Sequence, residues 1–190
     1  MRDIVVIGGP NGAGKTTAAP AIVPGELGIR EFVNADEIAR GLSPFNAEHA
    51  ALIAGRLMIE RMRTLIRAGE SFAFETTCAG RAHAEWLRTC KLAGWRMTLL
   101  FLWLRSPEAA LDRVARRMRQ GGHTIPADVV IRRYKAGLAN LRTLYLPLAD
   151  LATIYDNSDD GRVLIVEKAP GASLRIHDGA RWALIERASH

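Results

Sequence analysis

Residues 8–17, with the sequence GGPNGAGKTT, hold the side chains whose types and spacing point most directly to chemistry. They follow the pattern G-x-x-x-x-G-K-[ST], in which a glycine-rich loop turns backbone N–H groups toward phosphate. The lysine of such a loop reaches the β- and γ-phosphates, and the hydroxyl that follows it ligates Mg²⁺. We therefore predict nucleotide contacts from Gly9, Pro10, Asn11, Gly12, Ala13, Gly14, Lys15, Thr16 and Thr17, with Thr16 on the metal.

The elements on either side of this loop suit its task. The apolar, β-branched run at residues 3–8 predicts a buried strand, and a helix is expected to begin at Lys15. The N-terminus of that helix adds a favourable potential for anions. Pro20 and Pro24 are expected to keep the helix short.

The rest of the chain alternates between strand-like and helix-like segments. We expect further strands at 31–33, 71–77, 96–104 and 151–155, separated by helices at about 43–67, 82–94, 106–120 and 127–144. This alternation predicts an α/β fold in which a five-stranded parallel sheet carries helices on both faces. Residues of about 162–187 are expected to form a C-terminal β-hairpin that turns near Pro170-Gly171. The length suits a single domain over residues 1–190.

Charge is unevenly distributed along the chain. The formal net charge is +6, and the stretch from Arg105 to Arg142 holds nine Lys or Arg against three Asp or Glu. A basic segment on an otherwise balanced chain indicates that an anionic ligand binds there. The sequence shows no charged-then-apolar leader and no apolar run long enough to cross a bilayer. We therefore expect a soluble cytoplasmic protein with no membrane partner.

Two classes of phosphate-loop protein are excluded by the residues C-terminal to the loop. A transporter-type ATPase needs an LSGGQ-like signature and an acidic pair after a later apolar strand, and the strand at 96–104 lacks a terminal Asp. A guanine-nucleotide switch needs an N-K-x-D loop, which the sequence does not contain. A kinase needs a carboxylate beside the loop, a substrate shelf and mobile cations. Candidates for all three are present.

Carboxylates follow two of the predicted strands. Asp36 comes after the strand at 31–33, at the edge where loops of a parallel sheet gather around ligands, so it is a candidate general base. The DEIAR segment also permits Asp36 to cap a helix. Glu75 and Thr77 end the strand at 71–77 and are expected to face the same crevice. We expect Glu75 to meet Mg²⁺ through water or to contact substrate, with a salt bridge to an arginine as the alternative.

Residues 106–145 are expected to form a helical lid over ATP. Arg117 and Arg133 lie on the borders of the apolar stripes of the two lid helices, where they can reach the γ-phosphate. The same helical phase points other arginines to solvent, namely Arg113, Arg116 and Arg132. The tip of the lid carries His123, a candidate substrate contact. The DNSDDG segment after the last parallel strand makes Asn157 and Ser158 candidates for contact with adenine.

Taken in order, GGPNGAGKTT, FVNADEIARGLSP, FAFETT, GR, FLWLRSPEAALDRVARRMRQGGHTIP and IRRY resemble the zeta-toxin family of P-loop kinases, especially its short single-domain members. The resemblance covers about residues 3–158. It implies a P-loop NTPase/kinase fold like that of nucleoside monophosphate kinases and shikimate kinase. It also implies ATP- and Mg²⁺-dependent phosphorylation of a sugar hydroxyl, which in well-known members is the 3′-hydroxyl of UDP-N-acetylglucosamine.

The resemblance also implies roles for single residues. Asp36 corresponds to the family's base, Lys15 to its loop lysine, and Arg117 to a lid arginine. Glu75 and Thr77 correspond to a substrate-contacting strand end, and a second family arginine falls near Gly122-His123. Arg81, in the matching GR pair, is expected to contact substrate. Any antitoxin partner is expected to be a separate protein.

Two other functions remain open from the sequence. The same chemistry could serve a nucleic-acid 5′-hydroxyl or another small metabolite, although a nucleic-acid track calls for stacking aromatics and the basic segment holds only Tyr134. The chain could also be a non-catalytic nucleotide-binding partner protein. The intact Lys15, Thr16 and Asp36 argue against that alternative.

Overall fold

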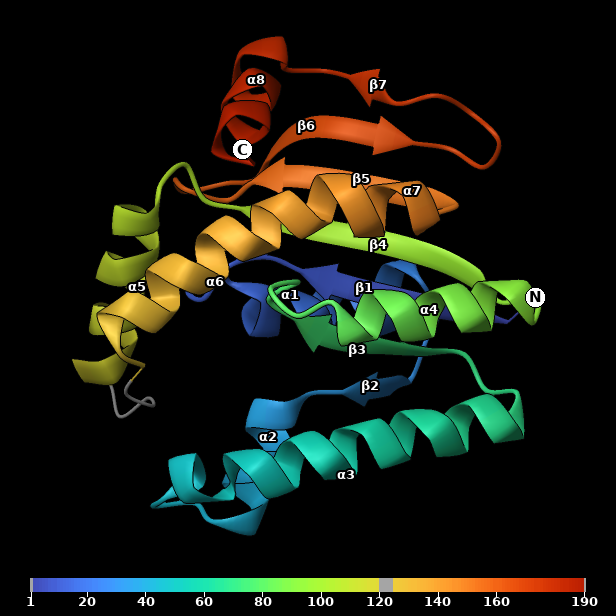
Figure 1. Ribbon diagram of the computed structural model, residues 1–190, viewed down its shortest axis with the longest axis vertical. Helices are drawn as coiled ribbons and strands as arrows, with labels where there is room; N and C mark the ends of the chain where they lie inside the picture. The colour runs from blue at the N-terminus through green and yellow to red at the C-terminus, as the bar shows by residue number, and fades with distance from the viewer. Residues whose placement is uncertain (1, 120–124, 190) are drawn as a thin grey trace.

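The computed structural model describes residues 2–119 and 125–189, and within them seven strands form one sheet (Figure 1). The order is β2 (Glu31–Val33), β3 (Phe72–Thr76), β1 (Asp3–Gly8), β4 (Arg96–Trp103), β5 (Leu151–Asp156), β6 (Val163–Lys168) and β7 (Arg175–Ile176). Neighbours among the first five are parallel, as the alternating pattern predicts. Strands β6 and β7 extend the sheet in antiparallel fashion. The α/β fold and its five parallel strands are therefore confirmed.

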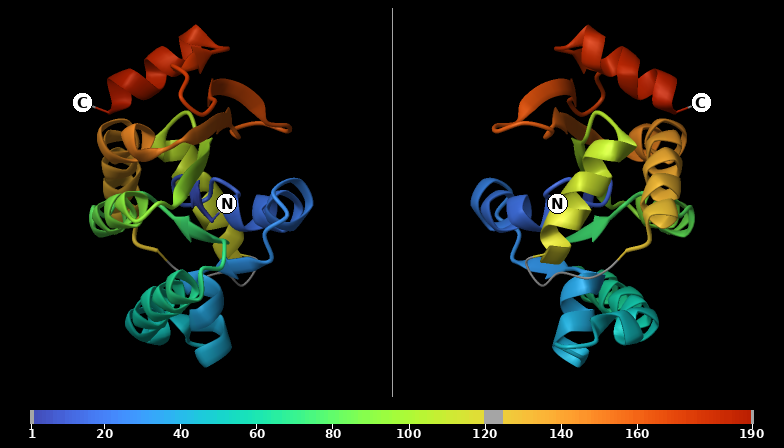
Figure 2. Two further views of the ribbon diagram at one scale, coloured as in Figure 1. Left: turned by 90° about the vertical axis from the view of Figure 1, so that its right-hand side faces the viewer. Right: turned by 90° about the vertical axis from the view of Figure 1, so that its left-hand side faces the viewer.

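Helices cover both faces of the sheet. Helices α4 (Ala82–Leu92) and α6 (Ala127–Asn140) lie on one face, and α1 (Lys15–Ala21), which continues into the wider helical turn η1 (Ile22–Glu26), lies on the other (Figure 2). Helix α6 continues through η2 (Leu141–Tyr145) and α7 (Leu146–Leu148). Helix α5 (Pro107–Arg119) begins where predicted, since the Ser106 hydroxyl accepts a hydrogen bond from the Ala109 N–H at 3.2 Å.

The core is divided by the central strand β1. Ile4 and Val6 belong to the larger apolar cluster, beneath α4 and α6, whereas Val5 and Ile7 pack with α1 and η1 on the other face. This alternation follows from the two-residue period of a strand that is buried on both sides. Because β1 is fixed from both faces, the loop at its carboxyl end is held in place.

The helix expected at about 43–67 is present as a single helix with a later start, and a further helix lies before it. Helix α3 (Ala47–Ala68) begins later, and a separate helix α2 (Ala35–Leu42) precedes it. Both lie beyond β2 at one end of the sheet (Figure 1). No helix in the described ranges is both long and apolar enough to span a membrane.

The C-terminal β-hairpin is shorter than the sequence predicted. Strands β6 and β7 pair around a turn at Pro170-Gly171, as expected, but helix α8 (Gly179–Ala188) occupies the part predicted to continue the second strand. The Asp178 side chain caps this helix by accepting the Arg181 N–H at 2.9 Å. Trp182 and Ile185, three positions apart, bury one face of it. Capping and this helical spacing therefore outweigh the strand-like residues.

Candidate functional site

The loop between β1 and α1 has a shape that requires glycine. Gly9 has φ 144° and Gly14 has φ 82°, both in the region that side chains rarely adopt. A Cβ atom on Gly9 would lie 2.3 Å from the Leu102 carbonyl oxygen, and one on Gly14 would lie 2.8 Å from the Asn157 amide nitrogen. The loop is thus a tight cradle of backbone atoms, which fits the phosphates of a nucleotide. Thr17, also expected at the nucleotide, lies exposed in the first turn of α1.

Lys15 is held at the mouth of this cradle. Its side chain is 6% exposed, and its ammonium group donates hydrogen bonds to the carbonyl oxygens of Gly9, at 2.8 Å, and Pro10, at 2.9 Å. Burial lowers the pKa of Lys15, and the nearby carboxylate of Glu75, whose Oε1 is 3.7 Å from Nζ, partly offsets the shift. A cation confined in this way has a strong electrostatic reason to bind an anion.

Glu75 joins the phosphate loop to the start of α2. Its Oε2 accepts a hydrogen bond from the Thr16 hydroxyl at 2.9 Å and another from the Asn34 amide at 2.8 Å. The structure therefore brings Thr16 and Glu75 together, as predicted. The expected alternative, a salt bridge from Glu75 to an arginine, is replaced in the described residues by the contact with Lys15.

Asn34 was not among the residues predicted for the site. It is 4% exposed and caps α2, because its Oδ1 accepts the Asp36 N–H at 2.8 Å and the Glu37 N–H at 3.4 Å. Asp36 therefore lies inside the first turn rather than at the cap position that the DEIAR segment suggested. The asparagine directly after the 31–33 strand was the available signal, since asparagine is among the preferred capping residues.

Asp36 lines a cleft beside the phosphate loop. The cleft has a volume of about 400 Å³, and Asn11 and Gly12 of the loop form one of its walls. Arg117 of α5 and Arg133 of α6 line the same cleft, so the structure brings these predicted residues together. The two arginines thus form a positive wall of the cleft that Asp36 also lines.

Of the three arginines expected to face solvent, Arg116 and Arg132 are exposed as predicted, and Arg113 was wrongly assigned. Arg132 also lines the cleft, together with Val129 and Arg133 of the same helix. Helix α6 therefore has a cleft face in addition to the buried face on which the sequence prediction was based. Arg113 donates hydrogen bonds to the Gly12 carbonyl at 3.5 Å and to the Ser158 carbonyl at 2.8 Å. Helix α5 therefore presents a second face to the phosphate loop, which one apolar stripe cannot reveal.

Other predicted substrate residues lie apart from the cleft or outside the described ranges. The Thr77 hydroxyl accepts the Ala79 N–H at 3.5 Å, in the turn that follows β3. Arg81 is exposed just before α4 and is not among the described residues that line the cleft. His123 falls outside the described residues. The structure therefore gives no support to Thr77 or Arg81 as part of this wall.

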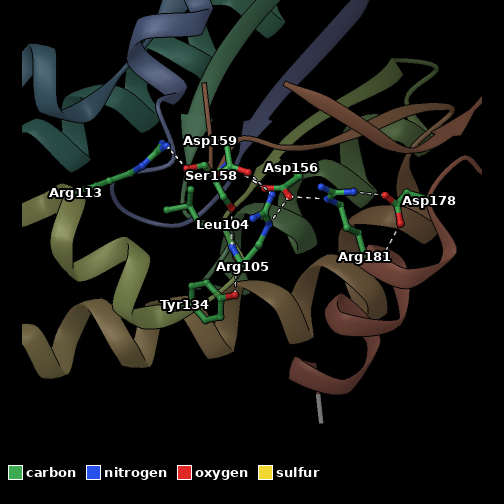
Figure 3. Close-up of polar contacts among 9 residues, drawn as sticks. All are labelled: Leu104, Arg105, Arg113, Tyr134, Asp156, Ser158, Asp159, Asp178 and Arg181. Atoms are coloured by element: carbon green, nitrogen blue, oxygen red, sulfur yellow. Dashed lines mark hydrogen bonds and ion pairs between the residues drawn. The ribbon is translucent and has the colours of Figure 1, made fainter. Parts of the chain in front are cut away.

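The segment after β5 contacts the phosphate loop from the other side. Asn157 donates a hydrogen bond from its amide to the Ala13 carbonyl at 2.8 Å, and the Ser158 hydroxyl accepts the Arg105 N–H at 3.0 Å. We refer to residues 156–159 as the strap. Figure 3 shows that contacts of the strap reach α5, through Arg113, and α8, through Arg181.

Asp156 begins the strap and is 1% exposed. Burial by itself would raise the pKa of this carboxyl group. Hydrogen bonds from Ser158, Arg181 and Arg105 outweigh burial, so the pKa of Asp156 lies below its ordinary value. The Asp156 carboxylate is therefore kept charged in the interior by three donors.

The donor set around the loop suits magnesium bound mainly through a nucleotide. No group of three or more His, Cys, Asp or Glu side chains in the described ranges gathers as a metal site. Mg²⁺ in nucleotide sites typically takes one or two protein oxygens, together with phosphates and water. The Thr16 hydroxyl and the adjacent Glu75 carboxylate fit that requirement.

A model of the AAA domain family matches residues 4–144. An uncharacterised protein of Haemophilus influenzae is 29% identical over 126 residues, which make up 66% of this chain and 88% of that protein.

Two sets of solved structures share the fold. A chain of the AvrRxo1-ORF1:AvrRxo1-ORF2 complex, solved with sulphate ions, is similar with a TM-score of 0.77 and 16% identity over 100% of this chain. The present chain spans 64% of the length of that one. The same complex solved with ATP has a TM-score of 0.74. A chain of the PezAT toxin–antitoxin system of Streptococcus pneumoniae has a TM-score of 0.65 and 15% identity, over 99% of this chain and 86% of that one.

The family match covers well over half of the residues, and the solved structures agree with it in architecture. The chain belongs to the AAA domain family, and its fold is that of a P-loop kinase-like domain.

Proposed function

We propose that the protein is an ATP- and Mg²⁺-dependent phosphotransferase that acts on an alcohol group. The observation that carries this proposal is the arrangement around the phosphate loop. Lys15, Thr16 and Glu75 form one contact network at the loop, and Asp36 lines the cleft that adjoins it. A nucleotide-binding partner protein would need the loop but would have no use for a carboxylate facing an open cleft.

The residues divide the chemistry between them. The loop and Lys15 hold the phosphates of ATP, and Mg²⁺, held by Thr16 and by Glu75 directly or through water, supplies charge neutralisation when bound. Asp36 accepts the proton of the acceptor hydroxyl as the acceptor oxygen bonds to the γ-phosphorus. The bond between the γ-phosphorus and the bridging oxygen breaks at the same time, and ADP leaves with that oxygen.

The arginines and the strap complete the site. Helices α5 and α6 act as a lid that lays Arg117 and Arg133 against the transferred phosphoryl group, and Arg132 adds a further charge to this wall. The nucleoside end of ATP lies against the strap, near Asn157 and Arg113. The phosphate loop therefore stands between the acceptor on one side and the nucleobase on the other.

For the acceptor we propose a sugar hydroxyl, and a UDP-sugar such as UDP-N-acetylglucosamine in particular. Three arginines and one carboxylate among the described lining residues make the cleft basic, which suits a diphosphate-linked sugar. The resemblance to zeta toxins and the fold shared with PezAT favour the same choice, and with it a separate antitoxin partner. AvrRxo1-ORF1:AvrRxo1-ORF2 supports a partner protein in the same way.

The test is ATP turnover with Mg²⁺ across UDP-sugars, free sugars, other small metabolites, nucleosides and 5′-hydroxyl oligonucleotides. Asp36→Asn should lower turnover by about 10²–10⁴-fold, the usual contribution of a general base. Glu37→Gln is the matched control, because Glu37 is the neighbouring carboxylate and pairs with Arg40 on the exposed face of α2. ATP binding without transfer to any acceptor would contradict the phosphotransferase. Transfer unaffected by Asp36→Asn would remove Asp36 as the general base.

A further inference from the structure

Arg181 of helix α8 contacts the buried carboxylate of Asp156, the first residue of the strap beside the phosphate loop. The Oδ2 atom of Asp156 accepts hydrogen bonds from the Nε atoms of Arg105 and Arg181, each at 2.8 Å (Figure 3). The Oδ1 atom accepts the Ser158 N–H at 2.9 Å. The three donors come from the β4–α5 connection, from α8 and from the strap itself, so Asp156 joins three separate parts of the fold.

The hydrogen bonds to the Asp156 carboxylate hold the strap in position. A buried carboxylate is costly unless it is fully paired, so removal of one partner leaves a charge that must move or find water. The residues directly after Asp156 make the contacts with the nucleotide side, since Asn157 bonds to Ala13 and Ser158 accepts from Arg113. A displacement of Asp156 would therefore also displace Asn157 and Ser158, the next two residues of the chain.

Helix α8 is anchored independently of the strap. Trp182 and Ile185 are buried, and an Arg142 guanidinium nitrogen donates to the Glu186 carbonyl at 3.1 Å. Arg181 also pairs with the Asp178 carboxylate at the N-cap of the helix. Helix α8 thus holds the guanidinium of Arg181 against Asp156, and this helix lies beyond residues 4–144, the part of the chain that the family model matches.

Sheet order determines which part of a nucleotide the strap faces. Asp36 comes after β2 and Glu75 lies near the end of β3, both on one side of the central strand β1, so the γ-phosphate and acceptor belong there. The strap follows β5, on the other side of β1 and beyond β4. A nucleotide whose phosphates lie in the loop after β1 must therefore extend its nucleoside toward the strap.

We propose that Arg181 is a positioning residue for the nucleoside of ATP, acting through Asp156 on the strap, so that helix α8 forms part of the nucleotide-binding site. This inference rests on the nucleotide binding of the proposed function and does not depend on the acceptor. Phosphate binding has its own support in the backbone cradle and Lys15. The contribution of Arg181 is therefore specific to ligands that carry a base and ribose.

The test compares binding of ATP and of inorganic tripolyphosphate by isothermal titration calorimetry with Mg²⁺ present. Arg181→Met should weaken ATP binding by about tenfold, within the usual range for coupling between sites, and leave tripolyphosphate binding within about twofold. Arg181→Lys keeps a cation but lacks the Nε–H group that bonds to Asp156. Its affinity for ATP should therefore lie between those of the wild type and Arg181→Met. Arg187→Met is the matched control, because Arg187 is exposed on the same helix and outside the network of Figure 3.

Three outcomes would overturn the proposal: unchanged ATP binding in Arg181→Met, an equal loss for both ligands in a folded variant, or the same loss in Arg187→Met. Thermal unfolding of each variant establishes that it is folded. If Arg181→Met does not fold, the comparison between Arg181→Lys and wild type carries the test. Absence of phosphoryl transfer to every acceptor would remove the proposed reaction without affecting this result, so the two failures are distinguishable.

Discussion

Asn34 offers the sharpest test of how the site is held together, because one buried side chain performs two tasks. Its Oδ1 caps α2, and its amide donates to Glu75. Loss of an N-cap costs about 1 kcal/mol, and loss of a hydrogen bond to a charged group costs about 1.5–3 kcal/mol. Asn34→Ala should therefore lower the free energy of unfolding by about 3 kcal/mol. In a chain of this size that corresponds to a fall in Tm of about 6–12 °C.

Asn34→Ser separates the two tasks. Serine is a good N-cap, but its shorter side chain cannot reach the Glu75 carboxylate. We expect Asn34→Ser to keep much of the stability that Asn34→Ala loses. Both variants should raise the Mg²⁺ concentration needed for half-maximal ATP turnover by about tenfold, equivalent to about 1.4 kcal/mol of lost support for Glu75.

Differential scanning calorimetry and Mg²⁺ titration of turnover measure the two effects. Asn46→Ala is the control, because Asn46 precedes α3 without a cap hydrogen bond from its side chain in the described part of the chain. In a Glu75→Gln background the effect of Asn34→Ser on the Mg²⁺ requirement should shrink, since a neutral acceptor forms a weaker bond. If Asn34→Ser requires no more Mg²⁺ than the wild type, the Asn34–Glu75 contact has no role in the site and the reasoning is refuted.

Two further predictions concern stability. Gly137→Ala should destabilise the fold by about 1–3 kcal/mol in urea unfolding, because the new Cβ would lie 2.6 Å from the Thr77 carbonyl oxygen. Gly55→Ala, which has open space at its Cβ, should instead stabilise α3 by up to about 1 kcal/mol. Equal effects would contradict the packing of α6 on the turn after β3. The folded-state pKa values of Asp150 and Asp156 both lie below the ordinary value of 3.8. Their stabilisation is therefore complete above that value and lost as the pH falls through the folded-state pKa. The free energy of unfolding, measured in urea, should therefore be lower at about pH 3 than at about pH 5. This decrease should be smaller in the Asp156→Asn variant, which lacks one of the two carboxylates.

Local patterns were enough to predict the phosphate loop and the parallel sheet. The spacing of Gly9, Gly14 and Lys15, and the alternation of strand and helix, are each encoded within a short stretch of chain. The contact between Thr16 and Glu75 was also predictable, because the carboxyl ends of parallel strands share one edge of the sheet.

The arginines show where sequence reasoning fails. A single apolar stripe assigns a helix one buried face, but α5 contacts both the core and the phosphate loop, so Arg113 was wrongly assigned to solvent. Arg132 is exposed as predicted, yet it also lines the cleft, which the apolar stripe of α6 could not reveal. The pairing of Asp156 with Arg181 joins two positions 25 residues apart across an antiparallel addition to the sheet. Nothing in the local pattern specifies that contact, since it depends on how α8 packs.

The hydrogen bond between Asn157 and Ala13 connects positions 144 apart in the sequence. On a ribosome that adds about 5–20 residues each second, the phosphate loop therefore emerges roughly 7–30 s before the strap that contacts it. Until β5 is made, β4 presents an unpaired edge and the nucleoside side of the site has no wall. Nascent chains should thus acquire their affinity for ATP late, in the same step that covers β4. Free nucleotide would then stabilise the finished protein far more than its precursors.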